Sequence, residues 1–351
     1  MALDAGLSWT CVALDEHPRF LQENAVPLDT PPLDEPTTNT PTVDLAYRPR
    51  LADLQPLNTS ASLLAPDEQT LLRPRITPAV QLQAREGYLD DFLGDFIVPW
   101  PSPDAELAGD VYPLGNAGDR LDYTHFSISM SRSRRMALYA GVNIDGARSL
   151  EVKRGRDAWS YDGRLPIEAQ IGESLYADNL LDRGHLVRRQ DPNWGPQAEV
   201  ANGDTFHFTN CSPQMGAFNQ KTWLELEDYI LDNTRRWKQR VTVFSGPVLN
   251  DEDRKYRGVS IPSAFWKVVA FLGEDGKPSA SAYLITQSRE LGQLDFTFGR
   301  LRTYQCSVAH IENLTRIGFG DLAQYDGFSN EERLTGTRIE AQIRGPQDIR
   351  L

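Results

Sequence analysis

The sequence has few cysteines and no long hydrophobic run, and each absence excludes a class of protein. Its three cysteines, Cys11, Cys211 and Cys306, cannot all pair within one chain, and their wide spacing fits no metal-binding motif. We therefore expect inert thiols in a reduced compartment rather than a disulfide framework. No stretch approaches the ~18 to 20 apolar residues of a membrane span, so we expect no membrane role.

The N-terminus and the loops lack two further signals. The first residues carry acids where a secretory signal carries a basic region, and no long apolar stretch follows. We expect a cytoplasmic location, with export by a non-classical route as the alternative. No GxGxxG motif and no glycine-rich phosphate-binding loop with lysine is present, so a nucleotide-binding fold of either kind is not indicated.

Positive charge is scarce overall but locally concentrated. The net charge of −13 opposes non-specific attraction to a polyanion, because phosphate binding depends on lysine and arginine. Basic residues nevertheless cluster at 131–135, 153–156 and 183–189. Charge alone argues against nucleic acid as a ligand, and these clusters keep the question open.

The 351 residues divide into an extension and a domain. Residues 1–75 hold 10 of the 23 prolines and 11 acids, and they show no sustained helical or strand period. We predict an irregular, acidic, Pro-rich arm, either a solvated tail or a segment that docks a partner or gates the site. Residues 76–351 are predicted to form one large domain.

Within that domain, short apolar runs alternate with turn residues and a few helical stretches. The apolar runs predict strands over residues 125–131, 136–144, 240–248, 264–272 and 280–286. A helix is predicted over 219–237, with Trp223, Leu226, Ile230 and Trp237 on one stripe, early acids and late arginines. We expect an α+β fold with a central, mainly antiparallel sheet flanked by helices.

The residues that carry chemistry lie between Asp182 and Glu227. DRGH (182–185) places His185 after a glycine that permits close backbone approach, and a neutral imidazole can act as a base near pH 7. Asn210 and Asn219 follow, nine residues apart, and Asn219 opens the predicted helix. An asparagine there is a cap or a Mg²⁺ ligand. Glu227 lies ~12 Å further along the helix axis, which favours a contact with the same ion through water.

This constellation resembles a known family. DRGH, then TNxxPQ (209–214) and NQxxWxxLE (219–227), are similar to the DNA/RNA non-specific endonucleases of the ββα-metal superfamily, which includes the Serratia-type nuclease. The resemblance continues through 245–248 and 261–269 and covers roughly residues 85–320. It implies a ββα-metal nuclease fold and Mg²⁺-dependent cleavage of DNA and RNA with little sequence specificity, leaving 5′-phosphate ends.

The resemblance also implies roles for individual residues. His185 is expected to be the general base, with its second ring nitrogen held by a backbone carbonyl. Asn219 is expected to be the direct ligand of Mg²⁺, with Mn²⁺ as a substitute ion, and Glu227 to orient a metal-bound water. Asn210 is expected to support the histidine by hydrogen bonding.

Arginines are the expected contacts to phosphate. The resemblance places one of them before DRGH, where Arg156 is our first choice and Arg154 the alternative, because a guanidinium binds phosphate with two parallel hydrogen bonds. Arg183, Arg188 and Arg189 are predicted to line a groove for the nucleic-acid backbone.

Other features have structural explanations. We interpret His207 as a strand residue, Cys211 as an inert thiol, and Trp223 and Trp266 as core. Three functions stay open: an active nuclease, a catalytically silent or arm-regulated nucleic-acid-binding relative, and a toxin or defence effector nuclease. A regulatory or inhibitor protein is a candidate partner of the arm, and the sequence leaves the oligomeric state undetermined.

Overall fold

The computed structural model describes residues 74–115, 118–155, 157–216, 222–287, 302–343 and 348–349, with the backbone alone for 222–225 and 302. Almost all of the predicted arm lies outside these ranges, so the domain boundary at residue 76 stays a prediction. Arg156 and Asn219 also lie outside them. None of the described helices combines the length and the apolar character that crossing a bilayer requires.

An eight-stranded sheet organises the domain, and every pairing in it is antiparallel, as predicted. Its strands, in spatial order, are β16 (Glu340–Ile343), β14 (Arg302–Cys306), β13 (Pro278–Thr286), β12 (Ala264–Leu272), β9 (Arg240–Val248), β5 (Ala137–Asp145), β4 (Phe126–Met130) and β3 (Leu121–Tyr123). Strands β9 and β12 are buried along almost their whole length, and their bounds coincide with the apolar runs from which the sequence predicts them.

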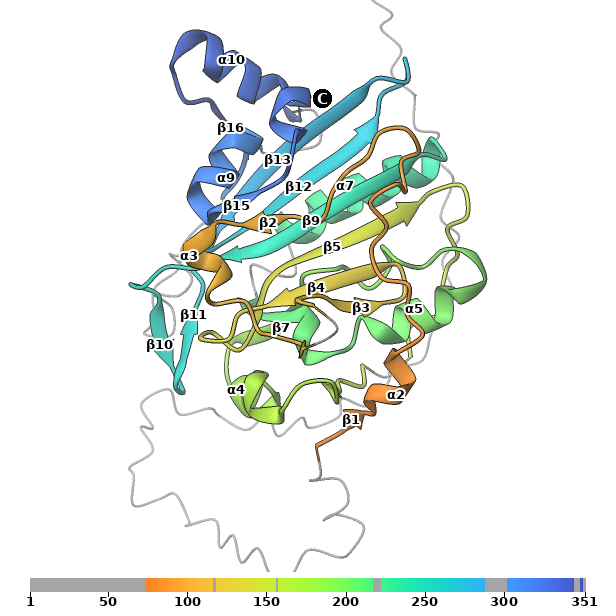
Figure 1. Cartoon of the computed structure of the whole chain (residues 1–351), viewed down its shortest axis with the longest axis vertical. Coiled ribbons are helices and arrows are strands. Elements are labelled where there is room, and N and C mark those ends of the chain that lie inside the picture. Colours follow the sequence, from red (N-terminus) through yellow and green to blue (C-terminus); the bar gives the residue numbers. More distant parts are fainter. Residues whose placement is uncertain are drawn as a thin grey trace, which may run out of the picture. The chain divides into compact units, whose positions relative to one another are not determined.

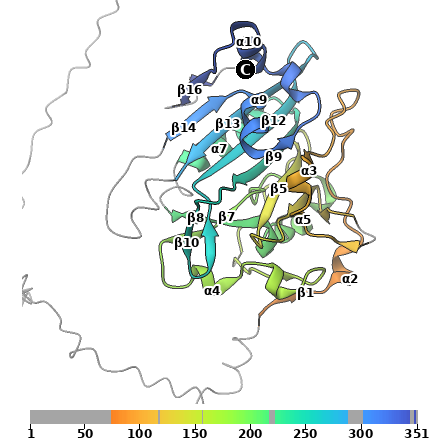
Figure 2. The same cartoon turned by 60° about the vertical axis from the view of Figure 1, so that its left-hand side comes forward.

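Helices and loops cover both faces of the sheet (Figures 1 and 2), and an apolar core lies on each face. On β12, Phe265 and Val269 face one core, while Trp266 and Val268 face the other. This alternation follows from the two-residue period of a strand and makes both faces of the sheet buried.

Helix α7 (Thr222–Arg236) covers the first face and α9 (Val308–Thr315) the second, as Figure 1 shows with α7 behind the strands. Leu226 and Leu231 of α7 pack into the first core. The predicted stripe is wrong at one position: Trp237 lies beyond the end of the helix and is 56% exposed, because the chain turns there through Lys238 at a positive φ of 54°. The side chain of Trp223 is outside the described residues.

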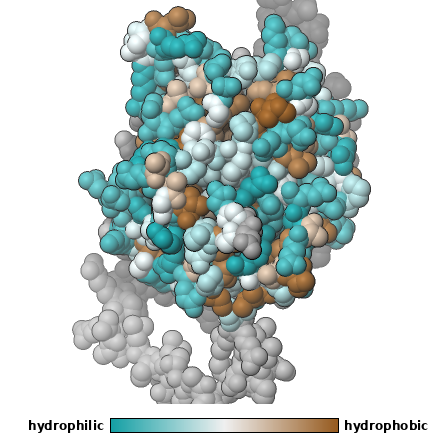
Figure 3. Space-filling model, viewed as in Figure 1, coloured by the Kyte–Doolittle hydropathy of each residue, from teal (hydrophilic) through white to brown (hydrophobic). Residues whose placement is uncertain are grey.

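Short elements complete the domain. The remaining strands are β1 (Ile76–Thr77), β2 (Ser102–Pro103), β6 (Tyr161–Asp162), β7 (Leu181–His185), β8 (Cys211–Met215), β10 (Arg254–Tyr256), β11 (Val259–Ile261) and β15 (Ile317–Gly318). The remaining helices are α2 (Ala79–Leu82), α3 (Ala105–Ala108), α4 (Glu173–Tyr176), α5 (Ala198–Asp204), α10 (Gly327–Thr335) and the 3₁₀ turns η3 (Ile167–Ala169), η4 (Gly195–Gln197), η5 (Phe208–Asn210) and η7 (Leu322–Tyr325). The surface around α3 and α9 is mostly hydrophilic, with apolar residues in separate patches (Figure 3).

Candidate active site

Strands β7 and β8 pair antiparallel on the face covered by α7, and they bring the first two motifs together. His185 lies opposite Cys211, and Gly184 lies opposite Ser212. A Cβ atom on Gly184 would come within 1.9 Å of Oε1 of Gln214, so only glycine permits this approach. With α7 following, the order β7, β8, α7 is the ββα arrangement that the resemblance implies, and the predicted fold class is confirmed.

A cleft of about 600 Å³ opens beside this pair of strands. It gathers six of the predicted site residues, namely Arg154, Arg183, His185, Arg188, Arg189 and Glu227. Asp157, Trp159, Asp182 and Gln190 complete its lining. The cleft therefore joins residues from a loop, a strand and a helix that lie far apart along the chain.

The ring of His185 is held by aromatic packing. Its centroid lies 4.8 Å from that of Trp159 and 5.2 Å from that of Phe206. The Nε2 atom is buried and has no hydrogen-bond partner among the described residues. The expected hydrogen bond from a backbone carbonyl to the second ring nitrogen is not among the contacts of the described residues, and the aromatic rings of Trp159 and Phe206 are the described neighbours of the imidazole.

Burial lowers the pKa of His185 to about 4, and it outweighs the opposing influence of the Asp157 carboxylate. The nearby guanidinium groups of Arg154 and Arg189 act in the same direction as burial. The imidazole is therefore neutral at neutral pH, with an unused nitrogen that can accept a proton.

Asn210 is fully buried beneath the cleft, where its amide binds backbone rather than solvent. Its Oδ1 accepts a hydrogen bond from the Val187 amide at 2.9 Å, and its Nδ2 donates to the carbonyl oxygens of Val187 at 2.9 Å and Thr205 at 3.0 Å. These bonds fix the chain immediately after His185. Its contacts are those of a residue that positions the histidine.

Glu227 lies at the inner end of the cleft, within the first turns of α7, and only 8% of it is exposed. Its Oε1 lies 3.1 Å from Nζ of Lys267, a lysine of β12 that is almost completely buried. Burial raises the pKa of Glu227, while Lys267 and Arg188 oppose that rise. The two cations therefore counteract part of the effect that burial has on the pKa of this carboxyl group.

The Asp191 carboxyl belongs to the same charged group beneath the cleft. Burial raises its pKa to about 7, with Glu227 adding to the rise and Arg188 and Lys267 opposing it. Sequence reasoning missed Lys267, Asp191 and Asp157. The signal for Lys267 was a charged residue at an inward position of an apolar strand.

The four described arginines of the cleft have different partners. Arg154 is bidentate on Asp157, at 3.2 and 2.6 Å, while Arg183 pairs with Glu173. Nη2 of Arg188 donates to Asp228 at 2.5 Å, and Nη1 of Arg189 donates to the Val152 carbonyl at 3.2 Å. The fork of Arg154 is thus already engaged by a carboxylate.

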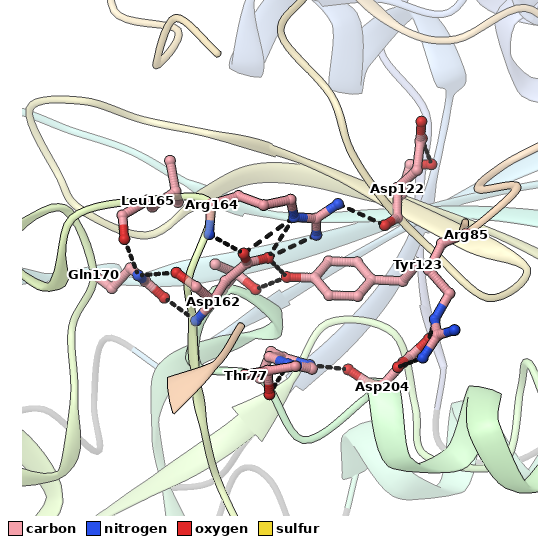
Figure 4. Close-up of polar contacts among 12 residues, drawn as sticks. Thr77, Arg85, Asp122, Tyr123, Asp162, Arg164, Leu165, Gln170 and Asp204 are labelled. Atoms are coloured by element: carbon pink, nitrogen blue, oxygen red, sulfur yellow. Dashed lines mark hydrogen bonds and ion pairs between the residues drawn. The ribbon is translucent and has the colours of Figure 1, made fainter. Parts of the chain in front are cut away.

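A buried polar network supports the segment that carries Trp159 (Figure 4). Asp162 receives two hydrogen bonds from the Arg164 side chain to its Oδ2, at 2.6 and 3.1 Å, and its Oδ2 also accepts from Tyr123 at 2.5 Å. The Tyr123 hydroxyl also contacts Thr209 at 2.6 Å, next to Asn210. The network therefore ties the Trp159 segment to the loop beneath His185.

Two residues that we interpreted as structural have that character. His207 is buried, with Nδ1 2.8 Å from the Asp204 carbonyl and Nε2 2.9 Å from Oγ1 of Thr77. It lies in an isolated bridge with Ser160 and caps a 3₁₀ turn, so the strand assignment is wrong. The thiol of Cys211 is buried and its pKa is raised to about 12, as expected for an inert cysteine.

Of the two predicted metal ligands, the structure describes Glu227, whose carboxylate is a hard oxygen donor of the kind that Mg²⁺ prefers. Within the described ranges, no three histidine, cysteine or acidic side chains gather as a ligand set. Glu227 supplies a buried carboxylate that lines the cleft, which suits an ion held by few protein oxygens and otherwise by water.

The residues that carry these motifs are similar to those of known proteins. The sequence model of a family described as DNA/RNA non-specific endonuclease matches residues 104–326. An uncharacterised protein of Sinorhizobium fredii, y4fB, is 39% identical over 296 residues, which are 77% of this chain and 44% of that protein.

Mitochondrial endonuclease G of Homo sapiens is 30% identical over 122 residues, covering 31% of this chain and 40% of that protein. The chain thus spans about two fifths of the length of these relatives. A crystal structure of a complex of EndoG with EndoGI, solved to explain EndoG inhibition, aligns with 63% of this chain and 94% of the solved chain, at 19% identity and a TM-score of 0.47.

Proposed function

Since the chain belongs to the DNA/RNA non-specific endonuclease family, we propose that it is a metal-dependent endonuclease. It hydrolyses phosphodiester bonds in DNA and RNA with little sequence specificity and leaves 5′-phosphate and 3′-hydroxyl ends. The observation that carries the proposal is the ring of His185, which lines a cleft that also holds arginines and the Glu227 carboxylate.

In this mechanism His185 is the general base. Its neutral ring accepts a proton from the attacking water, and Trp159 and Phe206 keep the ring in place. Asn210 is a positioning residue, because its three hydrogen bonds fix the chain that follows His185.

A metal ion and an arginine are proposed to neutralise the negative charge of the phosphate. A bound Mg²⁺, with Mn²⁺ as substitute, supplies positive charge to the phosphate and to the leaving 3′ oxygen. Asn219 would hold it directly, and Glu227 would orient one of its waters. Arg156 is our choice for the scissile phosphate, because the fork of Arg154 is already bound to Asp157.

The other cleft arginines, Arg183, Arg188 and Arg189, are proposed to contact the sugar-phosphate backbone of the substrate. Contacts to phosphate carry no base information, so cleavage with little sequence specificity is expected. The same contacts are available from DNA and from RNA.

A second candidate is an enzyme controlled through its N-terminal arm. Strand β1 pairs parallel with β6, two residues after Trp159, and Thr77 contacts His207. The point where the arm joins the domain is therefore linked to the segment that packs against His185. Comparing cleavage by the full chain with cleavage by a chain that begins at residue 74 tests this control, since a silencing arm predicts higher activity on its removal.

A regulatory or inhibitor protein that contacts the arm, a role as a toxin or defence effector, and a cytoplasmic location stay proposals. Cell fractionation tests the location. Growth of a host that expresses the wild type or His185→Ala tests toxicity.

Cleavage of supercoiled plasmid and of structured RNA, in Mg²⁺ and in EDTA, tests the main proposal. We expect nicked, linear and then fragmented plasmid only with metal, and no product from His185→Ala. Cutting that persists in EDTA contradicts metal dependence. Absence of cutting by both the full chain and the chain from residue 74 leaves a silent nucleic-acid-binding protein as the better explanation.

A further inference from the structure

Lys267 is the buried charge of the cleft that the proposed mechanism does not use. Its side chain is 1% exposed and lies on the face of β12 that packs against α7. Its neighbours on that face, Phe265 and Val269, belong to the apolar core. Burying an ammonium group is costly unless it is paired, so packing alone does not account for a lysine here.

The contacts of Lys267 connect the two halves of the site. Its Nζ lies 3.1 Å from Oε1 of Glu227 on α7. It also donates to the carbonyl oxygen of Leu186, at 3.4 Å, and to Oγ of Ser245 on β9, at 3.0 Å. Leu186 directly follows His185, so one ammonium group contacts both the Glu227 carboxylate and the backbone just after His185.

Other charged groups also lie near Glu227. Arg188, three residues after His185, acts on the carboxyl group through its charge, while its Nη2 donates a hydrogen bond to Asp228 of α7. Asp191 carries a carboxyl group rather than a cation, and the nearby Glu227 carboxylate raises its pKa. Lys267 differs from Arg188 in that its ammonium group directly contacts both the Glu227 carboxylate and the backbone after His185.

We propose that Lys267 is a positioning residue for phosphodiester cleavage, whose ammonium group holds the Glu227 carboxylate and the backbone after His185 in one fixed arrangement. The catalytic part of this inference rests on the proposed function. The coupling of Glu227 to the His185 strand is a property of the fold and is measurable without cleavage.

Kinetics of Lys267→Met, Glu227→Gln and the double variant test the catalytic part. Methionine matches the length of the lysine stem without its charge. We expect Lys267→Met to lower kcat about 10- to 100-fold with little change in KM, as for other groups that orient a metal-site residue. If Lys267 acts through Glu227, the double variant is no slower than the slower single variant. Losses that multiply, or a wild-type kcat in Lys267→Met, overturn the proposal.

Arg134→Met is the matched control. It removes the cation of a partly buried pair, Arg134 with Asp253 at 3.3 Å, and Arg134 lines a different cleft. A purely structural role for Lys267 predicts that both variants lose stability and keep the same kcat per folded molecule. We expect the loss of kcat only in Lys267→Met.

The NMR signal of the His185 ring, in the full chain with labelled histidine, tests the coupling independently of activity. The chain has five histidines, and His185→Ala identifies the signal. We expect Lys267→Met to shift the His185 signal and to leave that of His310 unchanged. An unshifted His185 signal overturns the proposal.

Two further variants keep this test decisive if Lys267→Met folds poorly. Ser245→Ala removes one acceptor of the ammonium group and is expected to shift the His185 signal in the same direction by a smaller amount. In the double variant of Lys267→Met and Glu227→Gln, neither partner leaves an unpaired buried charge. Its His185 signal is compared with that of Glu227→Gln alone. If the wild type cuts no nucleic acid, the proposed function fails, while the His185 signal still decides whether Lys267 couples the two halves.

Discussion

The two faces of the central sheet are both buried, yet they are filled by different chemistry. The face towards α9 is packed with aromatic rings: Trp266 lies 5.3 Å from Phe319, and Tyr88 lies 5.3 Å from Phe244, between ring centroids. The face towards α7 has an apolar core of its own, but Glu227, Lys267 and Asp191 are buried beside it.

The face towards α9 contributes mainly to stability, whereas the face towards α7 holds the groups that can react. Aromatic burial contributes to folding and leaves few groups that can react. Buried charges oppose folding, and on the α7 face they coincide with two strongly shifted pKa values, that of His185 at about 4 and that of Asp191 at about 7. Such a concentration of perturbed groups beside a cleft is typical of a functional site.

The largest expected effect on catalysis comes from removing the proposed base on the α7 face. We expect His185→Ala to lower kcat by about 10² to 10⁴-fold or more, with little loss of folding free energy, because the ring lies at the wall of the cleft. Single-turnover cleavage of plasmid measures the loss. His310→Ala, on α9, is the control and should cut at the wild-type rate; full activity in His185→Ala rules out the assigned base.

Removing an aromatic ring from the face towards α9 should instead lower stability and leave catalysis nearly unchanged. Trp266→Ala removes a fully buried ring and is expected to lower the free energy of unfolding by about 3 to 5 kcal/mol. Cleavage per folded molecule should stay within a few-fold of the wild type. Denaturant unfolding and active-site titration check this, and a loss of kcat comparable to that of His185→Ala would show that the two faces are not separable.

The pH dependence sharpens the role of the aromatic cage around His185. The base works only when its ring is neutral, so activity should fall as the pH drops through about 4 rather than through the ordinary 6.5. Trp159→Ala exposes the ring and should raise the pKa of His185, which moves the acid limb to higher pH. Profiles of kcat against pH for both proteins test this, and an acid limb near 6.5 in the wild type contradicts the burial argument.

A smaller effect is expected where the two motif strands meet. Gly184→Ala places a Cβ against the buried side chain of Gln214 and should lower the free energy of unfolding by about 1 to 3 kcal/mol. Gly203→Ala, in helix α5 with nothing within 4 Å of the added carbon, should instead raise it by up to about 1 kcal/mol. Thermal unfolding compares the two, and equal effects would mean that the contact with Gln214 is unimportant.

Much of the sheet could be predicted because alternation along a strand is a local property. Strands β9 and β12 have the predicted bounds, and helix α7 lies within the predicted range. The exposed Trp237 was misassigned because a periodic stripe does not reveal where a helix stops. Short strands such as β3 and β16 have too few residues to show a period, and only pairing with a neighbour defines them.

The amino-acid sequence determined the order of the three motifs and the apolar runs that form the long strands of the sheet. These depend on neighbours along the chain, where spacing and side-chain type are enough. Only the tertiary structure decided that Trp159 and Phe206 enclose His185, that Asp157 engages Arg154, and that Lys267 contacts both Glu227 and Leu186. Those facts depend on burial and on distances between charges, which arise when segments remote in sequence pack against each other.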